Sequence, residues 1–182
     1  MDKAICLLEV ASIARGFAVC DGMVKRAPVT VLVSDTADPG KYYVIVEGDV
    51  AAVEYAHQAG REIAAGTLLG ELLLANPHEQ LGLLLRGEPR DVEVDSLGVL
   101  ESSTIATTLL GADAAAKAAE VTLLEMGLAR HLGGKGYVTM TGTLDAVEAA
   151  IEAGSALMEH QGHLVGRVVI ANPGMKIKRL ND

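Results

Sequence analysis

Histidine and cysteine are the side chains in this sequence best suited to metal or nucleophilic chemistry. His160 and His163 stand three residues apart, but no third ligand is spaced to join them, so a pair of surface histidines is the favoured interpretation. Cys6 and Cys20, the two cysteines of the chain, lie within an expected strand and an expected helix, where buried thiols are favoured over reactive ones. The sequence therefore predicts no metal site and no cysteine nucleophile.

Two further patterns favour structure over catalysis. Residues 133–136 (GGKG) resemble a phosphate-binding loop, but they lack both the first glycine at the required spacing and a hydroxyl residue after the lysine. Glu9 and Glu101 occupy equivalent places in an internal repeat, which favours a shared structural role over a pair of catalytic acids. No Ser/His/Asp or Cys/His arrangement rises above the composition. We therefore predict that the protein is not an enzyme and has no cofactor.

Composition excludes other classes of function. The 182 residues carry a net charge of −9, with no tryptophan and one phenylalanine, so the chain lacks the positive charge and stacking surface that nucleic-acid binding requires. Half of the residues are apolar, which predicts a globular protein. No apolar run approaches the roughly 20 residues that span a bilayer. We expect a cytoplasmic protein that binds neither nucleic acid nor membrane.

The elements that position these side chains occur twice, because the sequence matches itself. At a shift of 92, ten residues recur within about thirty positions, among them Asp21 and Lys25 as Asp113 and Lys117. The shift then becomes 94 and finally 96, which indicates two insertions in the second copy. Further matches are Ile13 with Ile105, Lys41 with Lys135, Gly70 with Gly166, and Asn76 with Asn172.

Within a copy, hydrophobic periodicity alternates between that of a strand and that of a helix. Ser12 is a predicted N-cap, Pro28 ends the first helix, and Asp49 is predicted to cap the second helix as Thr143 does in the second copy. Residues 35–40 have turn composition. The expected elements are a strand over 4–10, a helix with apolar residues at 13, 17, 20, 24 and 27, strands over 29–34 and 42–47, a helix to about residue 65, and a strand over 68–75.

This order, β-α-β-β-α-β, is typical of a ferredoxin-like α+β sandwich, in which two helices cover one face of a sheet. The segment between the copies contains RGEPRD, which is linker chemistry. We therefore predict two tandem ferredoxin-like domains, at residues 3–81 and 96–175, joined by a linker over residues 82–95.

Several short motifs recur in the same order in both copies. The first copy has residues 21–27 (DGMVKRA), 29–32 (VTVL), 48–53 (GDVAAV) and 76–78 (NPH), and the second has 112–119 (ADAAAKAA) and 172–173 (NP). In the order and spacing of these motifs the chain resembles the bacterial microcompartment shell domain over nearly its whole length. The resemblance is to unpermuted tandem-domain shell proteins, which form trimers that imitate the hexamers of single-domain relatives.

The resemblance implies a structural tile of a microcompartment shell in the bacterial cytoplasm. Such a tile is a homotrimer that assembles with other shell proteins and encloses a central pore for small metabolites. Residues 35–41 and 129–136 align with the family's pore loops, where glycine suits backbones that crowd a symmetry axis. The implied pore-lining residues are Asp38, Pro39, Gly40, His131, Leu132, Gly133 and Gly134.

Four residues are implied at the edge of the tile. Lys25 and Lys117 have the helix position where the family carries a lysine that meets its counterpart on a neighbouring oligomer, although two solvated helix lysines are the alternative. The family often has Arg-Pro-His after the last strand, whereas Asn76 and Asn172 stand there in this sequence. An amide keeps hydrogen bonding but lacks the charge and the planar fork of arginine.

Among tandem shell proteins, the likeness is to the iron-sulfur type of the propanediol-utilising compartment. There the first-copy loop carries a cysteine just before Pro-Gly-Lys, and three symmetry copies bind one cluster. This sequence has Asp38 at that position, and a carboxylate is a poor cluster ligand, so we expect no cluster. Three such carboxylates around a pore would disfavour anions, unless Lys41 points into the channel and offsets their charge. An ordinary turn residue is the alternative for Asp38.

Two other classes of function remain open from the residues alone. Ferredoxin-like folds host many functions, so a trimeric regulatory protein that binds a small molecule is the alternative to a shell tile. An enzyme with a site between the two copies is a third possibility.

Overall fold

The computed structural model describes residues 3–88 and 92–174. It contains two compact units, one of residues 1–86 with 129–134 and the other of residues 87–128 with 135–182. Each unit has its own four-stranded sheet. In the described part of the chain, no helix is long and apolar enough to cross a membrane.

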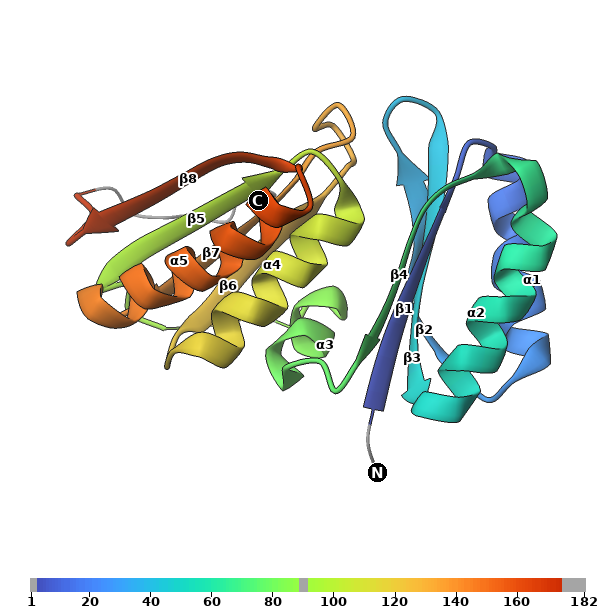
Figure 1. Cartoon of the computed structure of the whole chain (residues 1–182), viewed down its shortest axis with the longest axis horizontal. Coiled ribbons are helices and arrows are strands. Elements are labelled where there is room, and N and C mark those ends of the chain that lie inside the picture. Colours follow the sequence, from blue (N-terminus) through green and yellow to red (C-terminus); the bar gives the residue numbers. More distant parts are fainter. Residues whose placement is uncertain (1–2, 89–91, 175–182) are drawn as a thin grey trace. The chain divides into compact units, whose positions relative to one another are not determined.

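The first unit is an antiparallel sheet with two long helices on one face (Figure 1). Its strand order is β2-β3-β1-β4. The elements are β1 (Lys3–Val10), α1 (Ile13–Arg26), β2 (Thr30–Ala37), β3 (Lys41–Asp49), α2 (Val50–Ala64), the 3-10 turn η1 (Ala65–Thr67), β4 (Leu68–Ala75) and α3 (Glu79–Leu85).

The second unit repeats this arrangement (Figure 1). Its strands have the equivalent order, β6-β7-β5-β8. The elements are β5 (Ser96–Ser102), α4 (Ile105–Ala118), β6 (Thr122–Leu128), β7 (Gly136–Gly142), α5 (Leu144–His160) and β8 (Leu164–Ala171). Both units therefore have the β-α-β-β-α-β order, and the prediction of two ferredoxin-like α+β units is confirmed.

Hydroxyl side chains start three of the four long helices. Ser12 Oγ accepts a hydrogen bond from the backbone N–H of Arg15 at 3.3 Å, as predicted. Thr104 and Thr143 make the equivalent bonds at the starts of α4 and α5. Asp49 occupies the N-cap position of α2, but its side chain makes no capping hydrogen bond. Asp49 therefore occupies the cap position without accepting a hydrogen bond from the helix, whereas Thr143 accepts one.

The central strand β1 is buried on both faces. Cys6, Leu8 and Val10 join the core beneath α1 and α2, and Ile5 and Leu7 on the alternate face are also buried. A strand covered on both sides is a continuous apolar run, and residues 4–8 have that pattern.

The core face of α1 differs from the line of apolar residues that predicts the helix. Gly16, Val19 and Met23 are the buried residues, whereas Phe17 is 63% exposed and Val24 is 46% exposed. Gly16 is packed so closely against the sheet that a Cβ at this position would collide with the ring of Tyr42. The helix therefore has two apolar sides, of which one faces its own sheet and the other is open.

The short helix α3 was not predicted. Its N-cap is His78, whose Nδ1 accepts a hydrogen bond from the backbone N–H of Gln80, and its residue Leu81 is fully buried. The helix continues to Leu85, so the proposed linker over 82–95 begins with helical residues. Residues 89–91 of that linker and residue 175 of the proposed second domain lie outside the described residues.

Candidate functional site

The two predicted pore loops are hairpin tips of different length. Strand β2 ends at Ala37 and β3 begins at Lys41, so the first tip is residues 38–40, with Gly40 in the left-handed region at φ 74°. The second tip is residues 129–135 between β6 and β7. Its left-handed residues are Ala129, His131, Gly133 and Gly134. The predicted turn over residues 35–40 is thus shorter than expected, because residues 35–37 extend β2.

Residues 129–134 belong to the first compact unit, and they contact the first tip there. The backbone N–H of Gly133 donates to Asp38 Oδ2 at 3.3 Å, and the N–H of Asp38 donates to the carbonyl of Ala129 at 3.4 Å. Arg130 Nη1 lies 3.2 Å from Asp35 Oδ2. The structure therefore brings Asp38 together with the segment that contains His131, Leu132, Gly133 and Gly134, while Pro39 and Gly40 are exposed.

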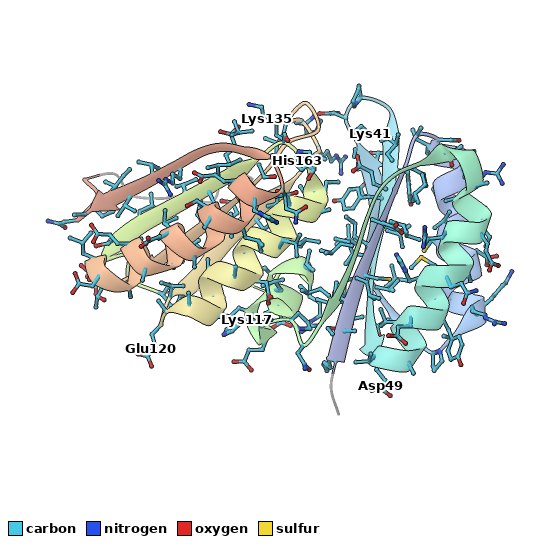
Figure 2. All side chains as sticks on the ribbon, in the orientation of Figure 1. Lys41, Asp49, Lys117, Glu120, Lys135 and His163 are labelled. Carbon is cyan, nitrogen blue, oxygen red and sulfur yellow. The ribbon has the colours of Figure 1, made fainter. Side chains whose placement is uncertain are left out.

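A glutamate–lysine ion pair holds the base of each tip. Lys41 Nζ lies 2.8 Å from Glu9 Oε1, and Lys135 Nζ lies 2.9 Å from Glu101 Oε1. Figure 2 labels the two lysines. The first pair is the more buried, with side-chain exposures of 7% for Glu9 and 27% for Lys41. A carboxylate so far from water requires a charged or hydrogen-bonding partner. The ammonium of Lys41 is therefore directed toward the carboxylate of Glu9.

A glycine on the neighbouring edge strand leaves room for each glutamate. In the sheet registers Gly70 of β4 stands opposite Glu9, and Gly166 of β8 stands opposite Glu101. A Cβ at Gly70 would lie 3.4 Å from Glu9 Oε2, and a Cβ at Gly166 would lie 3.7 Å from Glu101 Oε2, so each glycine position is in contact with its glutamate. The glutamate, lysine and glycine thus form one repeated unit, which we call the tip anchor. Each of the three residues recurs in the sequence, but only the structure brings them together.

The predicted edge lysines form ion pairs within their own helices. Lys25 Nζ lies 2.7 Å from Asp21 Oδ2, and Lys117 Nζ lies 2.6 Å from Asp113 Oδ2, both at i,i+4 spacing. Lys25 and Asp21 are well exposed, whereas the side chain of Asp113 is 8% exposed. The first-copy pair is the one open to solvent on both partners, so it stabilises the isolated helix by a few tenths of a kcal/mol at most.

Asn76 and Asn172 follow the last strands in a left-handed conformation, with φ of 49° and 47°. Their backbone N–H groups donate to the carbonyls of Lys3 at 2.8 Å and of Asp95 at 3.1 Å. Asparagine tolerates this backbone region better than most residues do, arginine included. Asparagine therefore suits the backbone conformation of this chain at both positions.

The residues that were weighed for metal or nucleophilic chemistry do not assemble into a site. Among residues 3–88 and 92–174, no group of three His, Cys, Asp or Glu side chains is placed to hold a metal. Burial raises the pKa of the Cys6 thiol to about 12, so it stays protonated and unreactive. His163 Nδ1 lies 2.9 Å from Ser103 Oγ, which gives this histidine a local structural partner.

One charged cluster of the first unit was missed by sequence reasoning. Glu71 Oε2 on β4 lies 2.9 Å from Arg61 Nε and 3.1 Å from His57 Nε2, both on α2. The pKa of His57 is lowered, chiefly by burial and also by the charge of Arg61, although Glu71 acts to raise it. The second copy has Ile151, Ser155 and Arg167 at these places, so the repeat gave no signal for the cluster.

Comparison of the sequence with known proteins assigns the chain to one family. The sequence matches the BMC domain over residues 4–77 and again over residues 96–173. It is 36% identical to the bacterial microcompartment shell protein PduT of Citrobacter freundii over 173 residues, covering 95% of this chain and 94% of that protein. It is 33% identical to the carboxysome shell protein CcmK2 of Synechococcus elongatus over 89 residues, covering 47% of this chain and 87% of the relative.

Comparison with solved structures also finds microcompartment proteins. A microcompartments protein from Desulfitobacterium hafniense DCB superposes with a TM-score of 0.92 at 39% identity, covering 95% of this chain and 96% of that one. The fused permuted hexameric shell protein MSM0275 of the RMM microcompartment superposes with a TM-score of 0.62 at 23% identity, over 87% of this chain and 82% of its own, a likeness of fold alone.

Proposed function

This chain belongs to the BMC-domain family of bacterial microcompartment shell proteins, and on that premise we propose that it is a trimeric, pseudohexameric tile with a central pore for small metabolites. The tile has no catalytic role. Its domains are residues 3–81 and 96–175 in unpermuted order, with the linker over 82–95. The family match shows a shell protein with two BMC domains, and surfaces of the chain support the trimer and the pore.

An asymmetry between the two copies supports the trimer. The open side of α1 corresponds, at the repeat shift of 92, to a side of α4 that is buried within the chain. The pairs are Ile13 at 40% exposure with Ile105 at 0%, Phe17 at 63% with Leu109 at 0%, and Val24 at 46% with Ala116 at 6%. The sequence therefore has apolar residues at the same helix positions in both copies, and on α1 these residues are open to a partner chain.

The second unit offers a matching apolar surface on its edge strand. Val168 and Ile170 of β8 are 44% and 37% exposed. They pair in register with Val99 and Leu97, which flank Gly98, and a Cβ at Gly98 would meet Val147 of α5. Val168 and Ile170 therefore face away from α5. One apolar surface on each unit allows head-to-tail contacts, which close into a ring when the rotation permits.

We propose that the two hairpin tips surround the pore of this ring. The proposed lining is Asp38, Pro39 and Gly40 from the first tip and His131, Leu132, Gly133 and Gly134 from the second. Lys41 is paired with Glu9, and Arg130 lies against Asp35. The carboxylate of Asp38 accepts a backbone N–H and has no cationic partner among the described residues, so its charge is left to act on permeating solutes.

The proposed edge of the tile contains Lys25, Lys117, Asn76 and Asn172. Lys25 is the most accessible of these lysines, with 73% of its side chain exposed against 43% for Lys117. Contacts between tiles join this chain to other shell proteins. The unequal exposure indicates that the first copy contributes more to these contacts than the second.

Electron microscopy of the full-length protein mixed with a single-domain shell protein tests the proposal. We expect incorporation into sheets or closed shells, and the variant Lys25→Ala should tile less well than Arg15→Ala, an exposed site outside the proposed edge. A discrete trimer that never tiles would favour the small-molecule-binding regulatory protein instead. A stable monomer at micromolar concentration in light scattering would refute both.

A further inference from the structure

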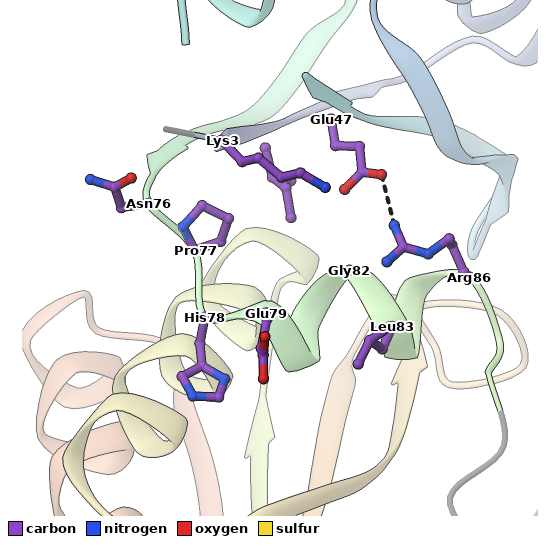
Figure 3. A pocket seen from close by; sticks show the side chains of 10 residues that line it. Lys3, Glu47, Asn76, Pro77, His78, Glu79, Gly82, Leu83 and Arg86 are labelled. Atoms are coloured by element: carbon purple, nitrogen blue, oxygen red, sulfur yellow. Dashed lines mark hydrogen bonds and ion pairs between the residues drawn. The ribbon is translucent and has the colours of Figure 1, made fainter. Parts of the chain in front are cut away.

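A pocket of about 480 Å³ lies in the first unit, where the ends of β1, β3 and β4 meet α3 (Figure 3). All of its lining residues belong to that unit. The pocket is distinct from the hairpin tips, because its strand residues come from the opposite ends of β1 and β3. Its volume lies within the range of sites that bind small molecules.

A partly exposed ion pair forms one wall of the pocket. Arg86 Nη1 lies 2.7 Å from Glu47 Oε1, and the side chain of Glu47 is only 15% exposed. Gly82 of α3 leaves room for the pair, since a Cβ there would lie 3.3 Å from Glu47 Oε2 and from both terminal nitrogens of Arg86. The carboxylate of Glu47 therefore neutralises the guanidinium on that wall.

Lys3 supplies a further positive charge. Its side chain points toward Glu47 and Arg86, whereas the side chains of His78 and Glu79 point away from them (Figure 3). In the described part of the chain, the ammonium of Lys3 forms no ion pair within 4.0 Å. Of the two other charged groups in the lining, the ammonium of Lys3 therefore faces the Glu47–Arg86 pair, and the carboxylate of Glu79 points away from it.

Apart from Asn76, His78 and Glu79, the rest of the lining is apolar. Ile5, Pro77 and Leu83 contribute hydrocarbon from β1, from the turn after β4, and from α3. A ligand that fits this lining has one anionic group and a short aliphatic part. A doubly charged group such as phosphate at neutral pH would meet the carboxylate of Glu47 and is disfavoured.

The charged residues of this pocket are specific to the first copy. The repeat places Asp95 at the position of Lys3 and Thr141 at that of Glu47. Since the second unit builds the same fold without these charges, the fold does not require them. Their presence beside a pocket is therefore evidence of a role that only the first copy has.

From these observations we propose that the pocket binds a short-chain aliphatic monocarboxylate. The carboxylate lies at the ammonium of Lys3, and the chain of the ligand packs on Ile5, Pro77 and Leu83. This binding is independent of the trimer and of the pore, so its failure would leave the proposed shell function intact.

Titration calorimetry on the full-length protein with sodium butyrate tests this proposal. We expect one site per chain with a Kd on the order of 1 mM, because so small a ligand has few atoms to contribute. Lys3→Gln should weaken binding about tenfold, the effect of removing one charge-assisted hydrogen bond. Lys3→Arg should retain affinity within about threefold. Arg15→Gln, which removes an equal charge from the exposed side of α1, should leave the Kd unchanged.

Two further probes identify the group recognised and the place of binding. Butyramide, a neutral analogue of the same size, and inorganic phosphate should each bind at least about tenfold more weakly than butyrate. In methyl NMR spectra, butyrate should shift the signals of Ile5 and Leu83. Equal binding of butyramide, tighter binding of phosphate, an unchanged Kd for Lys3→Gln, or methyl shifts confined to other regions would each overturn the proposal.

Discussion

The tip anchors test how burial determines the contribution of an ion pair to stability, because one chain contains the same pair at two degrees of burial. Removing the lysine with Lys41→Met leaves the carboxylate of Glu9, 7% exposed, without its cation. Stranding one partner of a fully buried pair costs about 3 to 5 kcal/mol. Because Lys41 is 27% exposed, solvent reduces this cost, and we expect a loss of about 2 to 4 kcal/mol.

The matched change in the second copy is Lys135→Met. Its partner Glu101 is 39% exposed and Lys135 is 50% exposed, so water replaces much of what the lysine provides. The expected loss is therefore at most about 1 kcal/mol. The double variant Glu9→Gln, Lys41→Met should recover part of the larger loss, because it leaves no charge buried.

Urea denaturation of the four proteins measures these differences, and hydrogen exchange assigns each loss to its own unit. Equal destabilisation by Lys41→Met and Lys135→Met would refute the argument from burial. A double variant no more stable than Lys41→Met would show that packing of the lysine stem, and not the stranded carboxylate, causes the loss.

The remaining predictions concern the pore, the ring and the turn after the last strand. If three Asp38 carboxylates face one axis at about 8 Å, each pair repels by about 0.5 to 2 kcal/mol, so Asp38→Asn should raise the flux of an anionic solute relative to a neutral one, most at low salt; an unchanged ratio assigns Asp38 to the turn alone. Anaerobic reconstitution should give no cluster absorption in the unmodified protein, and stoichiometric cluster would contradict the hard-ligand argument. Phe17→Asp should shift the mass measured by light scattering toward the monomer while Arg15→Asp does not, and an intact trimer would exclude the α1 surface from the interface. Asn76→Gly should be nearly neutral while Asn76→Arg costs about 1 kcal/mol in the free energy of unfolding, because of its positive φ, and equal melting temperatures would count against that cause.

The sequence predicts the elements well where local signals agree. Strand β4 is found at its predicted residues, and the cap at Ser12 has the predicted hydrogen bond. The helix α3 was missed because its run of leucines lies beside linker composition, and its stabilisation comes from burial of Leu81 rather than from helical periodicity. Short helices depend on tertiary packing, which the sequence does not display.

The sequence could not predict which side of α1 packs on the sheet, for a different reason. Both of its sides are apolar, so periodicity finds the helix but cannot say which side meets its own sheet. The sequence likewise predicted only part of the candidate site. Recurrence singled out Glu9 with Glu101 and, separately, Lys41 with Lys135, yet only the sheet register joins them into a tip anchor. Copy-specific residues such as Lys3 and Glu47 gave no recurrence at all.

The unequal hairpin tips have a consequence for how such a protein can evolve. A single-domain subunit presents the same loop at every position around a symmetry axis, and any mutation changes all of them together. Two copies in one gene free every second loop to vary. Here the anchors have stayed alike while the tips, residues 38–40 and 129–135, have diverged in length and in backbone conformation. Selection can therefore alter the chemistry of one set of loops without disturbing how either set is mounted.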